Sequence, residues 1–427
     1  MDSALAYLDR HVNFEKAAAR HKAPTLDRMV RLCTLLGDPQ TAYPVVHVTG
    51  TNGKGSTVRM VSALLAAQGL SVGTYTSPHL ERINERFVWD AAPIDDAALA
   101  DLLHDIEMYE AHLGAELTHF EVLTAAALRW FADIAVDVAV VEVGLGGRWD
   151  STNVVDGSVA VVTNVGLDHV EVIGPTTVEI AQEKAGIIKP GSRVVLGETD
   201  PLLDPIFAAA PSAGLWRRDV DFGAIRNVVA VGGRLLDLKT PYGVSDDVFL
   251  PLRGAHQGDN SACALAAAEA FFDRQIDLSV VRRAFVDLQV PGRFEVVRRA
   301  PLVVLDGAHN PDGARALAST LADDFAGRAP NVLVVGLTQG RDPREMLSLM
   351  GAPGARQVVA CAPHHPRALP ASEVAAAARQ LGVDASEAPT VEAAIAQAME
   401  AVSDDEFVLI SGSLYLVGEA RARLGHT

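Results

Sequence analysis

The chain has 427 residues, of which 49% are hydrophobic and 21% are charged, and its formal net charge is −18 at pH 7. This length exceeds what one hydrophobic core usually organises, and it predicts two or three domains. The acidic excess argues against broad binding to nucleic acid or to anionic membranes, because both depend on surplus Lys and Arg. An anionic ligand must therefore be met by a local group of positive charges.

Cys33, Cys263 and Cys361 are widely spaced and form no CxxC pair, which is typical of a reducing compartment. No apolar run approaches the length of a membrane span, and the N-terminal stretch lacks the basic and apolar blocks of a signal peptide. We therefore expect a soluble, cytoplasmic protein with no membrane or nucleic-acid partner.

In chain order, short apolar runs alternate with Ala-rich segments of helical period, which predicts β-α units around a mostly parallel sheet. The clearest predicted strands of the first part are 45–48, 138–143 and 159–165. Capping boxes, in which a threonine and a glutamate three residues later satisfy free backbone amides, predict helix starts at Thr118 and Thr176.

Residues 215–250 have a weak helical pattern and are rich in Val, Gly and Asp, so we expect a few antiparallel strands there. From Pro301 the β-α alternation restarts. The predicted elements are strands at 302–306, 331–336, 357–361 and 407–411 and a helix from Pro311. A hinge near 291–296 predicts two domains, 1–294 and 295–427.

The stretch HVTGTNGKGSTVRM (47–60) is similar to a phosphate-binding loop but departs from G-x-x-x-x-G-K-[ST]. Val48 takes the place of the first glycine, and Gly55 follows Lys54. The stretch lies between a β-branched strand and a helix that ends at Gly69, where glycines let backbone amides close on phosphate oxygens. Lys54 would reach the β- and γ-phosphates; the alternative is a Gly-rich turn with a solvated lysine.

In VVEVGLGGRWDSTNV (140–154), Glu142 ends an apolar strand, where ligands bind in open α/β sheets. A magnesium ion bound to ATP is one partner for this carboxylate, and an ion pair with Arg148 is the alternative. Trp149 occupies the last position of G-x-G-x-x-G, which argues against a dinucleotide site.

Asp168 and His169 follow the next strand, in GLDH, and Lys184 lies on the helix after them. A structural histidine and a solvated lysine are the alternatives to a site. Three successive strand ends, however, would present Lys54, Glu142 and His169 at one edge of the sheet, which favours a site.

LDGAHNPDGARAL (305–317) is another strand-to-helix turn and contains Asp306, His309 and Asn310. Taken alone, it is either a capped turn or a site. Arg293, beside the predicted hinge, is a natural phosphate ligand.

Together these segments closely resemble folylpolyglutamate synthases and the bifunctional dihydrofolate synthases/folylpolyglutamate synthases of the Mur-ligase superfamily. The resemblance runs from TLDRM (25–29) to GSLYLVGEA (412–420). It is carried by GTNGKGS, TSPHL, EVGLGGRWDSTN, GLDH, EKAGIIKPG, HQGDN, PGR and DGAHNPDG. GTNGKGS is that family's own form of the phosphate loop. The resemblance implies an α/β fold, with a P-loop ATPase domain on a mostly parallel sheet and a smaller Rossmann-like C-terminal glutamate-ligase domain.

The resemblance also implies a site, residue by residue. It implies ATP contacts at Thr51, Asn52, Gly53, Lys54, Gly55, Ser56, Asn260, Arg293 and Asp306. It implies ligands for two magnesium ions at Ser77, Glu142, His169 and Lys184, the last as a carbamate. Residues linked to catalysis are Lys54, Lys184, Asp306, His309 and Ser411. Contacts to the pterin side of the acceptor, the substrate to which glutamate is added, are implied at Leu26, Asp27, Arg28, Thr118, His119, Phe120, Glu121, Trp149, Asp150 and Ser151.

At Trp149 a smaller apolar residue is usual in the family, and at Ser151 alanine is frequent, which bears on the preferred acceptor.

The implied reaction adds L-glutamate to dihydropteroate, to reduced folates, or to both. ATP would form an acyl phosphate that the amino group of glutamate attacks, with release of ADP and phosphate, and the enzyme would be monomeric. One alternative is a ligase that forms another amide, but the motifs DSTN and EKAGI favour a folate ligase. The other is a nucleotide-dependent switch, which would leave Glu142, His169 and Lys184 unexplained.

Overall fold

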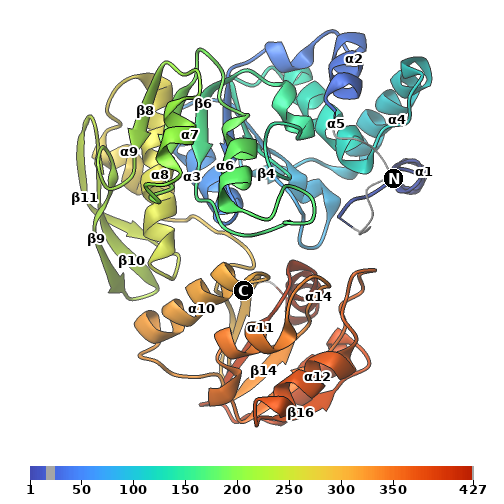
Figure 1. Ribbon diagram of the computed structural model, residues 1–427, viewed down its shortest axis with the longest axis vertical. Helices are drawn as coiled ribbons and strands as arrows, with labels where there is room; N and C mark the ends of the chain where they lie inside the picture. The colour runs from blue at the N-terminus through green and yellow to red at the C-terminus, as the bar shows by residue number, and fades with distance from the viewer. Residues whose placement is uncertain (16–24, 426–427) are drawn as a thin grey trace. The chain divides into compact units, whose positions relative to one another are not determined.

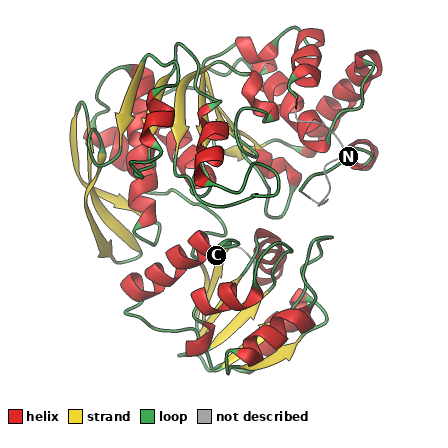
Figure 2. Cartoon of the chain, in the orientation of Figure 1, coloured by secondary structure: helices red, strands yellow, loops and turns green. Residues whose placement is uncertain are grey.

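The computed structural model describes residues 1–15 and 25–425, which fall into two compact units. The first unit lies within residues 1–228, 235–251 and 257–288, and the second comprises 229–234, 252–256 and 289–427. Each unit contains a sheet covered by helices (Figure 1, Figure 2), which confirms the predicted α/β fold class. The domain limits 1–294 and 295–427 stay a prediction.

The first unit is built on an eight-stranded sheet with the order β4-β3-β2-β5-β1-β6-β7-β8. Its strands are β1 (Val45–Thr49), β2 (Val72–Tyr75), β3 (Phe87–Trp89), β4 (Ala92–Pro93), β5 (Val138–Glu142), β6 (Gly157–Val162), β7 (Arg193–Leu196) and β8 (Gly214–Arg217). All strands from β2 to β8 in that order run parallel, and β3 and β4 extend the β2 edge in antiparallel pairing. The three strands predicted most clearly from sequence, β5, β1 and β6, are adjacent at the centre of this sheet.

The helices of this part of the chain are α1 (Asp2–Asp9), α2 (Asp27–Leu35), α3 (Lys54–Ala67), α4 (Asp96–Leu113), α5 (His119–Asp133), α6 (Thr177–Ala185), α7 (Asp204–Ala208), α8 (His256–Phe272) and α9 (Leu278–Phe285). Both predicted capping boxes are present, with Thr118 paired to Glu121 and Thr176 to Glu179. Within the described residues, none of the helices has the length and apolar character needed to cross a membrane.

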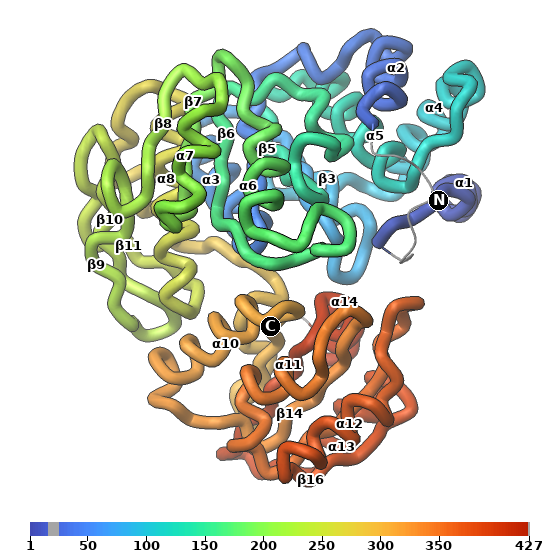
Figure 3. The backbone as a smooth tube through the Cα atoms, in the orientation of Figure 1, coloured from blue at the N-terminus to red at the C-terminus, as the bar shows by residue number. Residues whose placement is uncertain are grey.

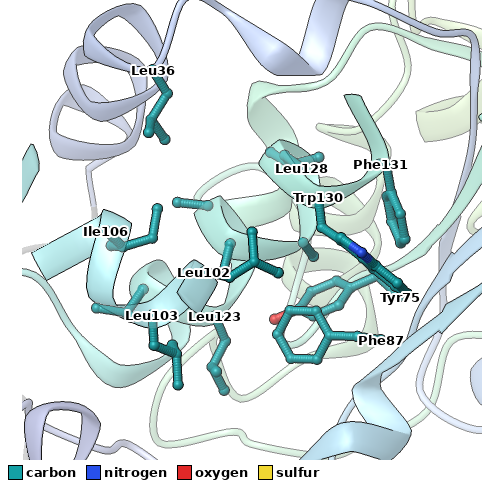
Figure 4. Packing of buried hydrophobic residues seen from close by; sticks show 14 of the residues in the cluster. Leu36, Tyr75, Phe87, Leu102, Leu103, Ile106, Leu123, Leu128, Trp130 and Phe131 are labelled. Atoms are coloured by element: carbon teal, nitrogen blue, oxygen red, sulfur yellow. The ribbon is translucent and has the colours of Figure 1, made fainter. Parts of the chain in front are cut away.

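A large hydrophobic cluster packs α1, α2, α4 and α5 against this sheet. Figure 4 shows Leu102 and Ile106 of α4 and Leu123 of α5 within it. The packing is close: a Cβ atom on Gly73 of β2 would lie 2.6 Å from the ring of Phe131. The absent side chain at Gly73 is therefore what allows α5 to approach the sheet.

A separate three-stranded sheet contains β9 (Gly223–Ala230), β10 (Gly233–Thr240) and β11 (Gly243–Leu250). Two-residue connections join these neighbouring strands, so they are antiparallel, as predicted for most of 215–250. Residues 215–217 differ, because they belong to β8 and pair in parallel with β7. A four-residue strand has too little pattern of its own to indicate its partner, which tertiary pairing decides.

The second unit is built on a six-stranded sheet with the order β12-β13-β17-β14-β15-β16. Its strands are β12 (Glu295–Arg299), β13 (Leu302–Asp306), β14 (Val332–Val335), β15 (Gln357–Ala360), β16 (Asp384–Glu387) and β17 (Phe407–Ser411). Only the β12 pairing is antiparallel. Its helices are α10 (Pro311–Asp324), α11 (Pro343–Leu349), α12 (Ala371–Gln380), α13 (Val391–Glu400) and α14 (Leu414–Leu424). The first three share one core cluster with the sheet, so the predicted second β-α series is confirmed.

Candidate active site

The GTNGKGS stretch forms a tight loop between β1 and α3. Gly53 caps α3 with a φ of 81°, a left-handed conformation that glycine adopts without strain. A Cβ atom on Gly53 would lie 2.4 Å from Oδ1 of Asn260 on α8. A Cβ atom on Gly50 would lie 1.8 Å from Oγ1 of Thr163, which follows β6. The loop therefore needs glycine at both positions, and Asn260, one of the predicted ATP contacts, lies beside it.

Lys54 is the first residue of α3, and its ammonium group lies over the loop. Nζ donates hydrogen bonds to the carbonyl oxygens of Gly50 (3.0 Å) and Thr51 (3.3 Å). The N-terminus of this 14-residue helix adds partial positive charge at the same place. This arrangement favours a phosphate-binding loop over a turn with a solvated lysine.

Glu142 is the last residue of β5 and is 4% exposed. Its Oε2 accepts a hydrogen bond from the backbone amide of Ser77 (3.2 Å), and a Cβ atom on Gly55 would lie 3.5 Å from the same oxygen. Arg148, the alternative partner, has its guanidinium 3.8 Å from Glu183. A carboxylate, the Ser77 segment and the phosphate loop thus meet beyond the central strands.

The glycines after Glu142 allow a loop to pack closely against the end of α6. A Cβ atom on Gly147 would lie 2.6 Å from the carbonyl oxygen of Glu183, and one on Gly186 would lie 2.5 Å from Cβ of Arg148. GLGGR therefore packs against the helix that carries Lys184 and does not form a dinucleotide turn.

Lys184 is 3% exposed on α6. Burial lowers its pKa to about 7; the positive charge of Lys54 also lowers it, while Asp168, Asp150 and Glu183 act in the opposite direction. A large fraction of the side chain is therefore a neutral amine near pH 7. The charge of Lys54 contributes to this lowering, so Lys184 lies within electrostatic range of the phosphate loop.

Asp168 and His169 follow β6, as expected. Asp168 is 7% exposed, and its Oδ1 accepts a hydrogen bond from the backbone amide of His169 (2.9 Å). The His169 side chain is 40% exposed. Because β5, β1 and β6 are parallel neighbours, Glu142, Lys54 and His169 all lie beyond the same edge of the sheet.

The predicted acceptor residues come from the starts of α2 and α5 and from the turn before Asn153. Arg28 forms an ion pair with Glu121 (2.9 Å), whose side chain is 3% exposed. Phe120 stacks on Tyr75 and fills the space that a side chain at residue 144 would need. Among the others, Thr118 and His119 are buried, Leu26 and Ser151 are half-buried, and Asp27 is exposed.

Asp150 is 6% exposed, and its carboxylate is hydrogen-bonded to other groups of the protein. The carboxylate accepts hydrogen bonds from the amides of Leu145 (2.8 Å) and Thr152 (3.0 Å). Burial raises the pKa of Asp150, and these hydrogen bonds lower it. Asp150 thus holds its turn in shape, while the neighbouring Trp149 is 49% exposed.

In the second unit, Asp306 lies at the end of β13. Its carboxylate accepts hydrogen bonds from the backbone amides of Phe294 and Ala308, both at 2.9 Å. A Cβ atom on Gly307 would lie 2.7 Å from Nη1 of Arg293. Burial raises the pKa of Asp306, and the Arg293 charge lowers it. Two residues predicted from different motifs, PGR and DGAHN, are therefore electrostatic neighbours.

Ser411 ends β17 directly beside Asp306 of β13. Its Oγ is buried and has no hydrogen-bond partner within the described part of the chain. Nδ1 of His309 lies 2.9 Å from the carbonyl oxygen of Gly307. Asn310 caps α10, because its side-chain oxygen accepts a hydrogen bond from the backbone amide of Gly313. Of the two roles predicted for this turn, Asn310 therefore has the capping one.

Comparison with known proteins agrees with this geometry. Residues 48–268 match the Mur ligase middle domain, and residues 292–414 match the Mur ligase glutamate ligase domain. A Mycobacterium tuberculosis protein named dihydrofolate synthase/folylpolyglutamate synthase is 40% identical over 443 aligned residues, covering 94% of this chain and 90% of that protein. This chain belongs to the folylpolyglutamate synthase/dihydrofolate synthase family of Mur ligases.

Solved structures of the family extend the likeness to the whole fold. Mycobacterium tuberculosis folylpolyglutamate synthase complexed with ADP has a TM-score of 0.92 and 37% identity, over 100% of this chain and 98% of that one. Escherichia coli FolC in complex with DHPP and ADP has a TM-score of 0.86 and 30% identity, over 98% and 96% of the two chains. The predicted family and the ATP-dependent ligase class are confirmed, whereas the individual site residues stay predictions.

Two arginines near the predicted site residues of this ligase were not predicted from the sequence. Arg341 follows β14, and its Nε donates to the carbonyl oxygen of His309 (3.1 Å). Arg86 is fully buried and contacts Glu15 and His79. Neither arginine lies in a recognisable motif, and a strand end followed by a polar turn is the only signal that pointed to Arg341.

Proposed function

We propose that this ligase adds L-glutamate to dihydropteroate, to glutamylated reduced folates, or to both, through an acyl phosphate and with release of ADP and phosphate. The observation that carries the proposal is the meeting of the phosphate loop, Glu142, Ser77 and the buried Lys184 beyond one edge of the sheet. The family relatives supply the choice of acceptor.

Amide formation from a carboxylate needs activation, and ATP provides it by phosphorylating the acceptor carboxylate. The amino group of glutamate then attacks the acyl carbon, and the phosphate leaves with the bridging oxygen. Lys54, the loop amides and the α3 N-terminus stabilise the negative charge that spreads over the transferring phosphoryl group.

Magnesium fits the donors that are present. The described residues contain no group of three or more His, Cys, Asp or Glu side chains placed to hold a metal ion. Magnesium, however, binds through one or two carboxylates, with water and nucleotide phosphates completing its shell. Glu142, with Ser77 at its side, and His169 would hold such ions, of which we expect two. When bound, magnesium neutralises phosphate charge.

Lys184 is suited to carbamylation, because only a neutral amine reacts with carbon dioxide and burial keeps much of this amine neutral. The carbamate would place an anion beside the positive charge of Lys54. It would also supply a further oxygen donor for magnesium.

In the second unit, Arg293 and Asp306 are proposed as nucleotide contacts, and His309 and Ser411 as groups that serve glutamate or catalysis. The unsatisfied hydroxyl of Ser411 supports a role in ligand binding, because buried polar atoms are nearly always hydrogen-bonded. On the acceptor side we propose Arg28, the 118–121 turn and Trp149. We also expect a monomeric, cytoplasmic enzyme.

Phosphate release measured with ATP, Mg²⁺ and L-glutamate, comparing 7,8-dihydropteroate with a reduced folate, tests the function. Glutamate-dependent release with both acceptors would establish two activities, and release with the folate alone would leave only chain extension. Oxygen-18 placed in the acceptor carboxylate should appear in the released phosphate if an acyl phosphate forms. No release with either acceptor from a folded, ADP-binding protein would contradict the proposal.

A further inference from the structure

Arg86 is the largest fully buried side chain of the described residues. It ends the short 3-10 helix η2 (Ile83–Arg86), immediately before β3. A guanidinium cannot lose its proton, so complete burial requires a counter-charge and hydrogen-bond acceptors around it. Arg86 is absent from every motif used to recognise the site.

The partners of Arg86 come from two different segments. Nη1 and Nη2 donate to the two carboxylate oxygens of Glu15, at 2.9 and 2.7 Å. Nε donates to Nδ1 of His79 at 2.9 Å, so this ring carries its proton on Nε2. Burial raises the pKa of Glu15, whereas the charge and hydrogen bonds of Arg86 lower it, and the resulting pKa lies below its usual value, so the carboxylate stays ionised. The bidentate pair is the strong form of ion pair, with a fixed geometry.

His79 and Arg86 close the loop that carries Ser77. The amide of Thr76 donates to the carbonyl oxygen of Arg86 (3.1 Å), which joins the two ends of the loop. Inside the loop, the carboxylate of Glu85 accepts the amides of residues 80, 81 and 82. The amide of Ser77 is thereby held toward Glu142. These hydrogen bonds define the shape of the 78–86 loop.

Glu15 belongs to a segment that runs beside the predicted acceptor turn. Val12 forms a parallel bridge with Thr118, and its carbonyl oxygen accepts the amide of His119 (3.0 Å). The charge of His119 also lowers the pKa of Glu15. Helix α1 and strand β3, whose backbones can be followed in Figure 3, both belong to the first unit.

We propose that Glu15, Arg86 and His79 form a clamp that fixes the acceptor turn at 118–119 relative to the Ser77 loop. Arg86 is then a positioning residue: it touches neither nucleotide nor acceptor, and it keeps the acceptor carboxylate in line with the phosphoryl group. The inference rests on the proposed function for the identity of the acceptor, while the clamp itself rests on the contacts above.

The test compares Arg86→Met, Arg86→Lys and the double variant Glu15→Gln/Arg86→Met with the control Arg82→Met. Arg82 lies on the same loop, but its ion pair with Asp96 is exposed. We expect Arg86→Met to lower kcat/KM for the acceptor about 100-fold, as misplacement of reacting groups by about 1 Å does. ADP affinity should change less than about threefold, because the clamp does not touch the phosphate loop.

The double variant separates positioning from stability. It removes both charges, so it should be more stable than Arg86→Met, in which the Glu15 carboxylate is left unpaired. Its kcat/KM should nevertheless stay low, because nothing ties the two segments together. Recovery of activity together with stability would overturn the clamp, as would Arg86→Met activity close to that of Arg82→Met. If Arg86→Met does not fold, Arg86→Lys carries the test: it keeps the charge but cannot serve Glu15 and His79 at once.

Hydrogen exchange gives a result that does not depend on turnover. The amides of residues 76–82 and 119 should exchange faster in Arg86→Lys than in the wild type, while those of α3 should not change. Unchanged exchange at both segments would overturn the clamp even if the wild type proved to use another acceptor. An inactive wild type with the expected exchange pattern would instead contradict only the proposed function.

Discussion

The side-chain oxygen of Asn260 occupies the space beside Gly53 where a Cβ atom would come within 2.4 Å. Gly53→Ala should therefore displace Asn260 and distort the phosphate loop, in addition to the strain of a positive φ. We expect ADP affinity to fall at least about tenfold, which calorimetry would measure.

Gly69→Ala is the matched control for this variant. Gly69 has a φ of +92°, but a Cβ atom there would meet nothing within 4 Å. Both variants should lose about 1 kcal/mol of unfolding free energy from the left-handed backbone, and only Gly53→Ala should lose ADP affinity. Equal ADP binding in both would show that Asn260 does not constrain the loop.

Lys54→Ala should abolish glutamate-dependent phosphate release, with a loss of about 100-fold or more in kcat. Its ammonium contacts only loop carbonyl oxygens in the described structure, so the thermal midpoint should change little. Phosphate release and a thermal melt of the same preparation check both expectations. Near-normal turnover would remove Lys54 from the site.

Lys184 should make the stability of the metal-free protein rise with pH. Its pKa is about 7 in the folded state and about 10.5 when unperturbed, so the unfolded chain binds more protons between these values. The free energy of unfolding should therefore increase across this window, by at most about 1.4 kcal/mol per pH unit. Below pH 7 the lysine is protonated in both states, and the slope vanishes.

Urea unfolding in EDTA and carbon-dioxide-free buffer, from pH 7 to 9.5, measures this slope. Lys184→Met should lose most of it, whereas Lys239→Met, at an exposed lysine, should keep it. The same slope in Lys184→Met as in the wild type would contradict a neutral buried amine.

If Lys184 acts as a carbamate, Lys184→Ala should lose about 100-fold or more in activity, and a small carboxylate such as acetate should restore part of it. Sodium chloride at equal ionic strength is the control for salt effects. Full activity in Lys184→Ala without added carboxylate would eliminate the carbamate role.

Trp149→Leu should raise KM for the acceptor about three- to tenfold and leave KM for ATP unchanged, because an exposed indole offers apolar stacking area to a planar ring. Trp89→Leu is the control, since Trp89, on β3, is 42% exposed and its Nε1 donates a hydrogen bond to Oγ of Ser71. An equal effect of both variants, or a change in KM for ATP, would argue against an acceptor contact at Trp149.

Local patterns carried much of the fold. The strands 302–306 and 407–411 and the two capping boxes follow from apolar runs and from hydrogen bonds within four residues, which the nearby sequence contains. Strand β8 was misjudged, because its partner β7 is chosen by tertiary packing. The clamp at Arg86 was missed for the same reason, since Glu15 lies 71 residues away along the chain.

By itself, the sequence determined the β-α order, the phosphate loop and the family, because glycines, capping residues and strand ends act over a few neighbouring residues. Only the tertiary structure decided the chemical state of Lys184 and the partners of Asp150, Glu142 and Arg86. Ionisation and buried hydrogen bonding depend on desolvation and on charges brought close by distant segments. Lys54 and Lys184 lie on different helices, and it is the parallel order of β1 and β6 that brings their charges into range.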